Sequence, residues 1–222
     1  YKRLMFPAKA MTVLGGDSFR DEHSIYFDGT NDYILVPTIT FTDSMSFSFW
    51  VKTDSSGSGA FLTSYEDGSN AVTIGTYNDK VDARFIGANT IQRVSDTWTH
   101  GQWNHVVCVC DSGTEDTGLT VYINGQVSTT ATSNSLGVSD ATGTVIGARN
   151  HSSSYGYDYE GYMSEIAVYN TLLTTSQVNT LYNGREPYNH KEGIASENLI
   201  NWWRMGDGDP NNRIYQYIDN SA

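Results

Sequence analysis

One short turn near the start of the chain gathers oxygen-bearing side chains. Asp28, Asn31 and Asp32 lie within five residues of one another, around Gly29, which permits a sharp bend. Calcium binds through several oxygen ligands, chiefly carboxylates and carbonyls, so the turn is a candidate calcium site. The same residues also fit a plain Asx-type turn, in which the Asp28 carboxylate accepts hydrogen bonds from backbone amides. Both interpretations stay open.

A second candidate site is a tyrosine-rich loop at residues 151–160, HSSSYGYDYE. Tyrosine rings on an exposed loop can stack on sugar faces, and neighbouring carboxylates can accept hydrogen bonds from sugar hydroxyls. Tyrosine, serine and glycine also serve protein interfaces well. A third interpretation is a surface loop whose rings pack locally. The candidate ligand-binding residues are Tyr155, Tyr157, Asp158, Tyr159 and Glu160.

The charge balance excludes two classes of partner. The 222 residues carry a formal net charge of −12, whereas nucleic acids and anionic lipids attract concentrated basic surfaces. We therefore expect no nucleic acid, and no membrane insertion because no apolar run approaches about 18 residues. Cys108 and Cys110 stand two apart in a strand-like run, which favours buried free thiols over a disulfide.

The elements that must position these residues are mainly strands. Apolar residues occupy alternate positions in SMSFSFWVK, residues 44–52, as in a strand with one buried face. Asn124-Gly125, between two such runs, is a strong hairpin signal. Further strands are expected at 24–28, 32–37, 60–65, 71–76, 81–86, 91–94, 103–110, 119–123, 127–131, 143–148 and 161–169.

One helix is expected near residues 174–183. Thr174 and Gln177 have the spacing of a capping box, and Val178, Leu181 and Tyr182 form a short apolar stripe. A helix of two to three turns needs the strands beneath it for stability. Gly184 is the expected stop signal.

Several segments together resemble a known family. The strings SIYFDGTNDYILVP, SFSFWVKT, WTHGQWNHVVCVCD, LTVYINGQ and TVIGAR follow one another in the order of the laminin-G-like modules of the concanavalin A-like lectin/glucanase superfold. The last matching piece, YEGYMSEIAVYNTLLTTSQVNTLYNG, is a strand followed by the helix. The resemblance implies an all-β fold, a two-sheet antiparallel jelly-roll sandwich.

The resemblance also bears on metal and catalysis. Many relatives bind a structural calcium near the first turn, which implies a calcium site at Asp28, Asn31 and Asp32, with Glu165 from the late strand; there the usual Asp before Glu is replaced by Met-Ser-Glu. The Glu-x-Asp-x-x-Glu pattern of the glucanases does not occur. Retaining hydrolysis needs two carboxyls about 5–5.5 Å apart. We predict no enzyme, with a glycoside hydrolase as a minor alternative.

The resemblance divides the chain into three parts. Residues 1–23 form an N-terminal arm, 24–184 the sandwich, and 185–222 a C-terminal extension that returns a strand to it. The string LINWWRMGDGDP is similar to the segment that usually opens such a module, so Leu199–Met205 is predicted to add a strand beside Ile25–Phe27.

The C-terminal extension also suggests a setting. GREPYNHKEGIASENLINWWRMGDGD resembles segments in structural proteins of marine tailed phages. We therefore expect a non-enzymatic module on a virion surface, in a capsid decoration, fibre or appendage. Its expected partners are other virion proteins, copies of itself, and glycans of the host surface. The alternative is a secreted, extracellular carbohydrate-binding or adhesion module.

Overall fold

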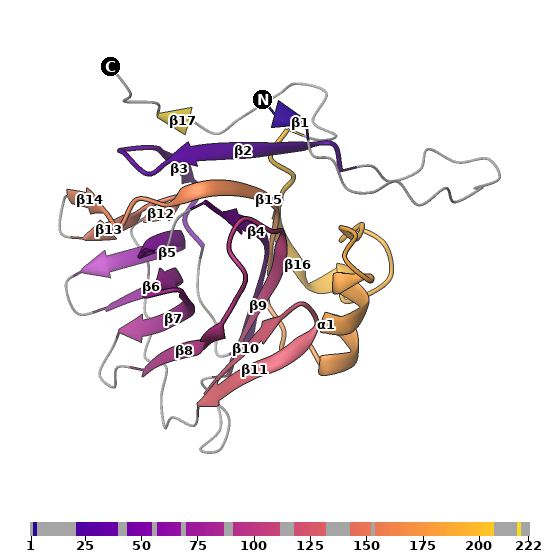
Figure 1. Ribbon diagram of the computed structural model, residues 1–222. Coiled ribbons are helices and arrows are strands. Elements are labelled where there is room, and N and C mark those ends of the chain that lie inside the picture. The colour runs from indigo at the N-terminus through magenta and orange to yellow at the C-terminus, as the bar shows by residue number, and fades with distance from the viewer. Residues whose placement is uncertain are drawn as a thin grey trace.

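The computed structural model describes residues 2–3, 21–39, 44–54, 57–67, 70–86, 91–111, 118–131, 143–151, 154–206 and 217–218. Within these ranges the chain forms two antiparallel sheets packed face to face, which is the predicted jelly-roll sandwich (Figure 1). A two-stranded ribbon, one α-helix and one 3-10 helix complete the described part of the chain. None of its helices has the length and apolar character that a membrane crossing requires.

The first sheet has eight strands, and β16 (Leu199–Trp203) joins it by pairing with β15 (Glu160–Tyr169) outside the main order. The others follow in the order β1 (Lys2–Arg3), β2 (His23–Asp28), β15 (Glu160–Tyr169), β4 (Ser44–Thr53), β9 (Asn104–Asp111), β10 (Leu119–Ile123) and β11 (Gln126–Ala131).

The second sheet has seven strands, in the order β17 (Tyr217–Ile218), β3 (Tyr33–Val36), β12 (Gly143–Ile146), β5 (Gly59–Asp67), β6 (Asn70–Tyr77), β7 (Lys80–Ile86) and β8 (Ile91–Thr97). The strands β13 (Arg149–His151) and β14 (Ser154–Gly156) form the separate two-stranded ribbon.

The core lies between the two sheets and is rich in aromatic rings. Phe49 from β4 and Phe61 from β5 are fully buried, and their ring centroids are 5.7 Å apart across the interface. Burying one such ring is worth about 1.5–3 kcal/mol. Cys108 and Cys110 are buried free thiols on the same inner face, as their spacing predicts.

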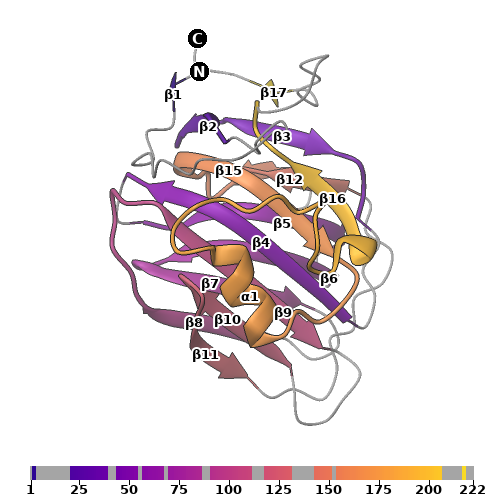
Figure 2. The ribbon, with the colours of Figure 1, turned by 90° about the vertical axis from the view of Figure 1, so that its right-hand side faces the viewer.

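The helix α1 (Thr175–Tyr182) covers the outer face of the eight-stranded sheet (Figure 2). The predicted capping box is confirmed: the Thr174 hydroxyl accepts from the Gln177 amide, and the Gln177 side chain accepts from the Thr174 amide. The helix ends at Asn183, which takes the left-handed conformation one residue before Gly184. Val178 and Leu181 are buried beneath the helix.

The C-terminal segment returns to the same outer face. After the 3-10 helix η1 (Ser196–Asn198), the strand β16 (Leu199–Trp203) pairs antiparallel with the half of β15 at residues 166–169. The strand β2 pairs with the other half, at residues 160–163. The prediction that this strand would lie beside Ile25–Phe27 is therefore wrong about its partner: β16 and β2 share one edge of β15, end to end.

The predicted strands are otherwise confirmed within a few residues at their ends. The ribbon β13–β14 was not expected, because its sequence, with His151 and three serines, has neither apolar alternation nor a short turn motif. This ribbon lies in the loop that was predicted to bind a ligand.

Candidate functional site

A hollow opens at one end of the seven-stranded sheet, on the sheet's outer face. It is partly open: about 400 Å³ of space unoccupied by atoms lies in it, open solvent included, and about 40 Å³ of this admits the centre of a water molecule. Strands β5, β6 and β7 form its floor and one wall, while the ribbon and the chain that follows it form the other wall. The lining residues are Gly59, Ala60, Thr73, Gly75, Thr76, Tyr77, Asp82, Arg84, Arg149 and Tyr157.

Small residues on the floor of the hollow leave space above the sheet. Ala60 of β5 lies directly opposite Gly75 of β6 in the strand pairing, and neither has a side chain larger than a methyl group. A Cβ on Gly75 would stand 2.1 Å from the carbonyl oxygen of Gly59, far inside van der Waals contact. Any larger residue at position 75 would therefore push β5 and β6 apart.

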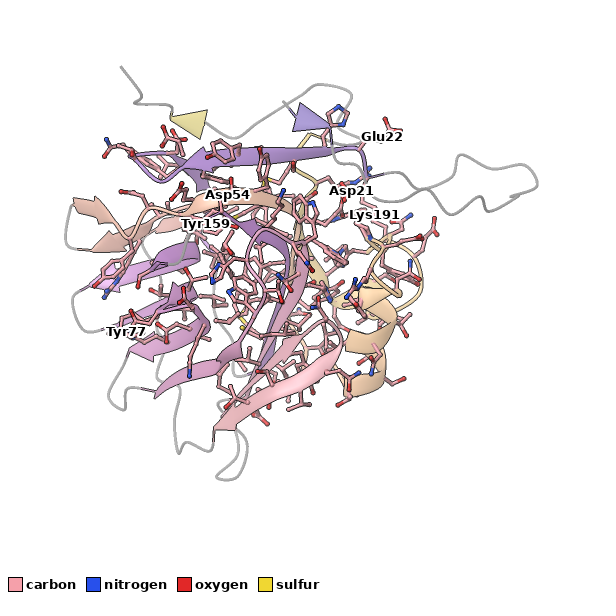
Figure 3. The ribbon with its side chains drawn as sticks, viewed as in Figure 1. Asp21, Glu22, Asp54, Tyr77, Tyr159 and Lys191 are labelled. Carbon is pink, nitrogen blue, oxygen red and sulfur yellow. The ribbon has the colours of Figure 1, made fainter. Side chains whose placement is uncertain are left out.

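Two tyrosine rings stand at the rim. Tyr77, at the end of β6, is 41% exposed, and Tyr157 is 54% exposed. Figure 3 shows Tyr77 at the periphery of the seven-stranded sheet, on the side away from α1. An exposed aromatic ring at the mouth of a concave surface is a common feature of ligand sites.

The conformation of Tyr157 is unusual and is held by the sheet. Its φ angle is 52°, in the left-handed region that a bulky residue seldom adopts. Its carbonyl oxygen accepts a 2.8 Å hydrogen bond from the Ala60 amide, and the Tyr159 amide donates to the Gly147 carbonyl at 2.8 Å. The Arg149 guanidinium lies 5.4 Å from the centre of the Tyr157 ring, within cation–π range. These contacts present the ring at the rim.

Polar side chains line the wall formed by β7. Because Val81 and Ala83 are buried in the core, strand alternation places Asp82 and Arg84 on the outer face. The Nη2 atom of Arg84 lies 3.7 Å from an Asp82 carboxylate oxygen.

Three buried polar atoms follow one another across neighbouring strands. Thr63 of β5 pairs with Thr73 of β6, which pairs with Arg84 of β7. Thr63 Oγ1, Thr73 Oγ1 and Arg84 Nε have no hydrogen-bond partner within the described part of the chain. Such groups each cost about 1–3 kcal/mol unless something satisfies them. The row ends at Thr73 and Arg84, two residues that line the hollow, although the three atoms themselves lie below its surface.

The predicted ligand loop contributes only in part. Tyr157 reaches the hollow, but Tyr159 is a core residue, 1% exposed and packed edge-on against Phe27 and Phe61. The expectation that Tyr159 would contact a ligand is therefore wrong, because strand β15 begins next to it and alternation turns its ring inward; Figure 3 shows it inside the molecule.

The other predicted residues of that loop are not among those that line the hollow. Asp158 is half-buried between Tyr157 and Tyr159, and Glu160 pairs with Asp28 at the start of β15. The side chain of Tyr155 lies outside the described residues, although its backbone belongs to β14.

The first turn has the hydrogen bonds of an Asx-type turn. Asp28 Oδ1 accepts from the Thr30 amide at 2.7 Å, and Asp32 Oδ2 accepts from the Asp28 amide at 3.1 Å. Asn31 is exposed with φ of 66°. Among the described residues, no three His, Cys, Asp or Glu side chains are placed to hold a metal ion. Calcium bound here would therefore draw on backbone carbonyls and Asn31 in addition to Asp28 and Asp32, and it stays a prediction.

Glu165 lies apart from that turn. It is fully buried at a bulge of β15, where its φ angle is 47°. Its carboxylate accepts from Trp202 Nε1 at 2.6 Å and from Arg204 Nε at 3.1 Å. The structure thus does not bring Glu165 to Asp28 and Asp32, and instead gives it a structural role in holding the C-terminal segment.

Two buried histidines lie on the outer side of the eight-stranded sheet: His105 stacks against Tyr182 of α1, and His190 belongs to the C-terminal segment. His105 Nε2 is 2.9 Å from the Ser48 hydroxyl, and His190 Nδ1 is hydrogen-bonded to the Tyr169 hydroxyl. Burial lowers the pKa of each histidine to about 3, and for His190 the charges of His105 and Arg204 act in the same direction. Both are therefore neutral, hydrogen-bonded structural residues.

Sequence reasoning missed most of the hollow. Tyr77, Asp82, Arg84 and Arg149 were not singled out, because they come from separate strands and only the sheet pairing brings them together. One usable signal was present: the outward positions of 71–76 and 81–86 alternate with buried ones, and they include a glycine and two charged residues.

Comparison with known proteins identifies the family. Residues 28–179 match Laminin_G_3, the concanavalin A-like lectin/glucanases superfamily. Because the match covers more than half of the chain, the protein belongs to this superfamily. A search of curated protein sequences found no match.

Solved structures show the same fold at low sequence identity. The heptameric SAP-like pentraxin of Limulus polyphemus is 21% identical, with a TM-score of 0.58 over 72% of this chain and 81% of that chain. The CBM40 of the Ruminococcus gnavus IT-sialidase, bound to α2,3-sialyllactose, is 13% identical, with a TM-score of 0.61 over 72% of this chain and 96% of that one. Domain 4 of a Geobacillus stearothermophilus GH43 extracellular arabinanase, in complex with arabinotriose, is 18% identical, with a TM-score of 0.59 over 79% and 84%.

Proposed function

We propose that this protein is a carbohydrate-binding module and that the hollow on the seven-stranded sheet is its saccharide site. The observation that carries the proposal is the combination of two exposed tyrosine rings with the polar side chains of Asp82, Arg84 and Arg149 in one concave place. A sugar has an apolar face that stacks on an aromatic ring and hydroxyls that both donate and accept hydrogen bonds. The hollow offers complements to both features.

The fold supports this function without deciding it. Two of the similar structures are domains solved with a saccharide bound. A shared fold hosts many functions, and the function of a particular protein lies in the site that the fold carries. The virion-surface role is a separate proposal about where such a module is displayed. It is supported by the resemblance of the C-terminal segment to segments in structural proteins of marine tailed phages. Its test is co-purification with intact particles at a stoichiometric copy number, and absence from every particle would remove it.

A glycan array tests the proposed function. The protein, labelled away from the hollow, should bind a restricted set of saccharides. Tyr157→Ala and Tyr77→Ala should each raise the Kd by about tenfold, which corresponds to about 1.4 kcal/mol of lost contact.

The matched control is Tyr26→Ala. Tyr26 is 38% exposed, close to the 41% of Tyr77, but it belongs to β2 in the other sheet. We expect this variant to bind like the wild type. An array without any bound saccharide, or equal losses in all three variants, would count against the hollow as a saccharide site.

A further inference from the structure

We propose that the hollow selects saccharides that carry a carboxylate, and that the Arg84 guanidinium is the group that holds this carboxylate. This inference rests on the proposed saccharide site and names the chemical class of its ligand.

Among the described residues, few partners use the hydrogen-bonding capacity of Arg84. A guanidinium has five N–H donors and no acceptor. Its ion pair with Asp82, the one found within the described part of the chain, spans 3.7 Å from Nη2, which is longer than a hydrogen bond. The Nε atom is buried and has no hydrogen-bond partner within the described residues. The side chain retains 27% exposure, so the guanidinium is anchored in the wall yet reachable from the hollow.

The local charge of the hollow is opposite to that of the whole chain. Its lining includes two arginines, Arg84 and Arg149, and one carboxylate, Asp82, which leaves a net charge of +1 (two minus one). The chain as a whole carries −12. An anionic ligand is therefore repelled by most of the surface and attracted at this place, which gives positional specificity.

The two arginines stand on different sides of the floor. Arg84 belongs to β7, whereas Arg149 belongs to β13, which contacts β5. Strands β5 and β6, with Ala60 and Gly75 opposite each other, lie between them. A sugar ring on this floor, stacked against Tyr157, places a ring substituent toward β7. Thr73, paired with Arg84 across the strands, lines the floor beside the guanidinium.

The geometry favours a carboxylate over other groups. The planar fork of a guanidinium matches the two oxygens of a carboxylate, and such charge-assisted hydrogen bonds are about twice as strong as neutral ones. A neutral saccharide would cover the exposed part of Arg84 while offering the guanidinium only a hydroxyl acceptor. Leaving a charged donor poorly paired costs more than leaving a neutral one.

The test uses matched saccharides that differ at one group. Titration calorimetry is carried out with galacturonic acid trisaccharide and with lactose capped by N-acetylneuraminic acid. Each is compared with its carboxyl-reduced counterpart and with a sulfated oligosaccharide of equal length. We expect at least one carboxylated saccharide to bind at least tenfold more tightly than its reduced form.

Three variants test whether Arg84 causes the preference for a carboxylated saccharide over its reduced form. Arg84→Gln should abolish the preference and change the Kd of the reduced saccharide less than threefold. Arg84→Lys keeps the charge but not the fork, and should lose at least fivefold of the preference. Arg185→Gln removes the same charge from an exposed position beyond α1, and should leave the preference unchanged. Circular dichroism spectra and melting curves verify that each variant is folded.

The outcomes separate the two proposals. Binding of neutral saccharides with equal or greater affinity overturns the carboxylate inference and leaves the saccharide site intact. Tighter binding of the sulfated oligosaccharide, or a preference that survives in Arg84→Gln, also overturns the inference. If no saccharide binds on the array or in calorimetry, the proposed function fails as well.

Discussion

His105 and His190 illustrate how single buried residues make this fold sensitive to acid. Each imidazole is 1% exposed and hydrogen-bonded to a neutral hydroxyl, so its neutral form fits the site and its charged form does not. Beyond burial, the Arg204 guanidinium also lowers the pKa of His190.

We predict that the free energy of unfolding falls as the pH drops below 6.5. In the unfolded chain each histidine binds a proton with its ordinary pKa of 6.5, whereas in the folded protein it does so only near a pKa of about 3. The unfolded state therefore binds more protons between these values, and stability rises with pH across that window. Each histidine should lower the free energy of unfolding by about 2 kcal/mol at pH 5 relative to neutral pH. Urea unfolding at the two pH values measures the difference.

Conservative variants isolate the histidines from the many carboxylates. His105→Gln keeps a hydrogen-bonding atom near Nε2, and His190→Asn keeps one near Nδ1. Each variant should reduce the slope of stability against pH, whatever its effect on absolute stability. An unchanged slope in both would contradict this account.

The capping box of α1 gives a second prediction at the residue scale. Thr174→Ala removes the hydroxyl that accepts from the Gln177 amide, and should lower the free energy of unfolding by about 1 kcal/mol. Thr174→Ser keeps the hydroxyl and should remain within a few tenths of a kcal/mol of the wild type. Equal losses in the two variants would mean that the cap is not the cause. Chemical denaturation measures both.

At the scale of elements, the edge of β15 explains why the chain continues beyond its helix. Strands β2 and β16 divide that edge, and Glu165 lies between their two pairing regions. Arg204 and Trp202, just after and within β16, satisfy the Glu165 carboxylate. Breaking a buried ion pair by removing one partner is strongly destabilising, because the other charge stays buried.

We therefore predict that deleting residues 186–222 sharply lowers the melting temperature. The deletion exposes the apolar residues under the C-terminal segment, among them Tyr169 and Leu173, and leaves Glu165 without Trp202 and Arg204. A chain that ends at Gly206 keeps β16 and is the matched control; it should melt close to the full chain. Differential scanning calorimetry compares the melting temperatures of the full chain, the deletion variant and the chain that ends at Gly206. A melting temperature that the deletion does not change would refute the stabilising role of this segment.

Most elements could be predicted from the sequence, for a local reason. Strand alternation, the Asn124-Gly125 turn and the capping box at Thr174 are each encoded within a few residues. The partner of β16 could not be predicted, because no local sequence pattern shows which half of the β15 edge remains free after β2 has paired with the other half. The ribbon β13–β14 was missed because polar residues form it without an apolar pattern.

At the scale of the whole molecule, the candidate site shows the limit of that reasoning. Tyr157 was found because it lies in a tyrosine-rich loop, but Tyr77 and Arg84 become neighbours only through the pairing of β6 with β7. Tyr159 was misassigned because it stands only two residues after Tyr157 in the same tyrosine-rich loop. The start of β15 next to Tyr159 turns its ring into the core.

The predicted calcium site at the first turn also concerns the whole molecule, because an ion there would link β2 of one sheet to β3 of the other. We expect EDTA to lower the melting temperature and added calcium to restore it. An ion present at a hundred times its Kd would contribute about 2.7 kcal/mol, or about 5–10 °C for a chain of this size. Asp32→Asn should weaken the response. A melting curve that EDTA does not alter would favour the hydrogen-bonded turn alone.

The location of saccharide binding is the central claim, and a nuclear magnetic resonance titration tests it most directly. Isotope-labelled protein is titrated with the saccharide that binds most strongly on the array, and backbone amide shifts are followed. We predict that the largest shifts fall in β6, β7 and the chain around Tyr157, at residues lining the hollow. Shifts concentrated instead at the 28–32 turn or around α1, with the hollow unaffected, would contradict the account.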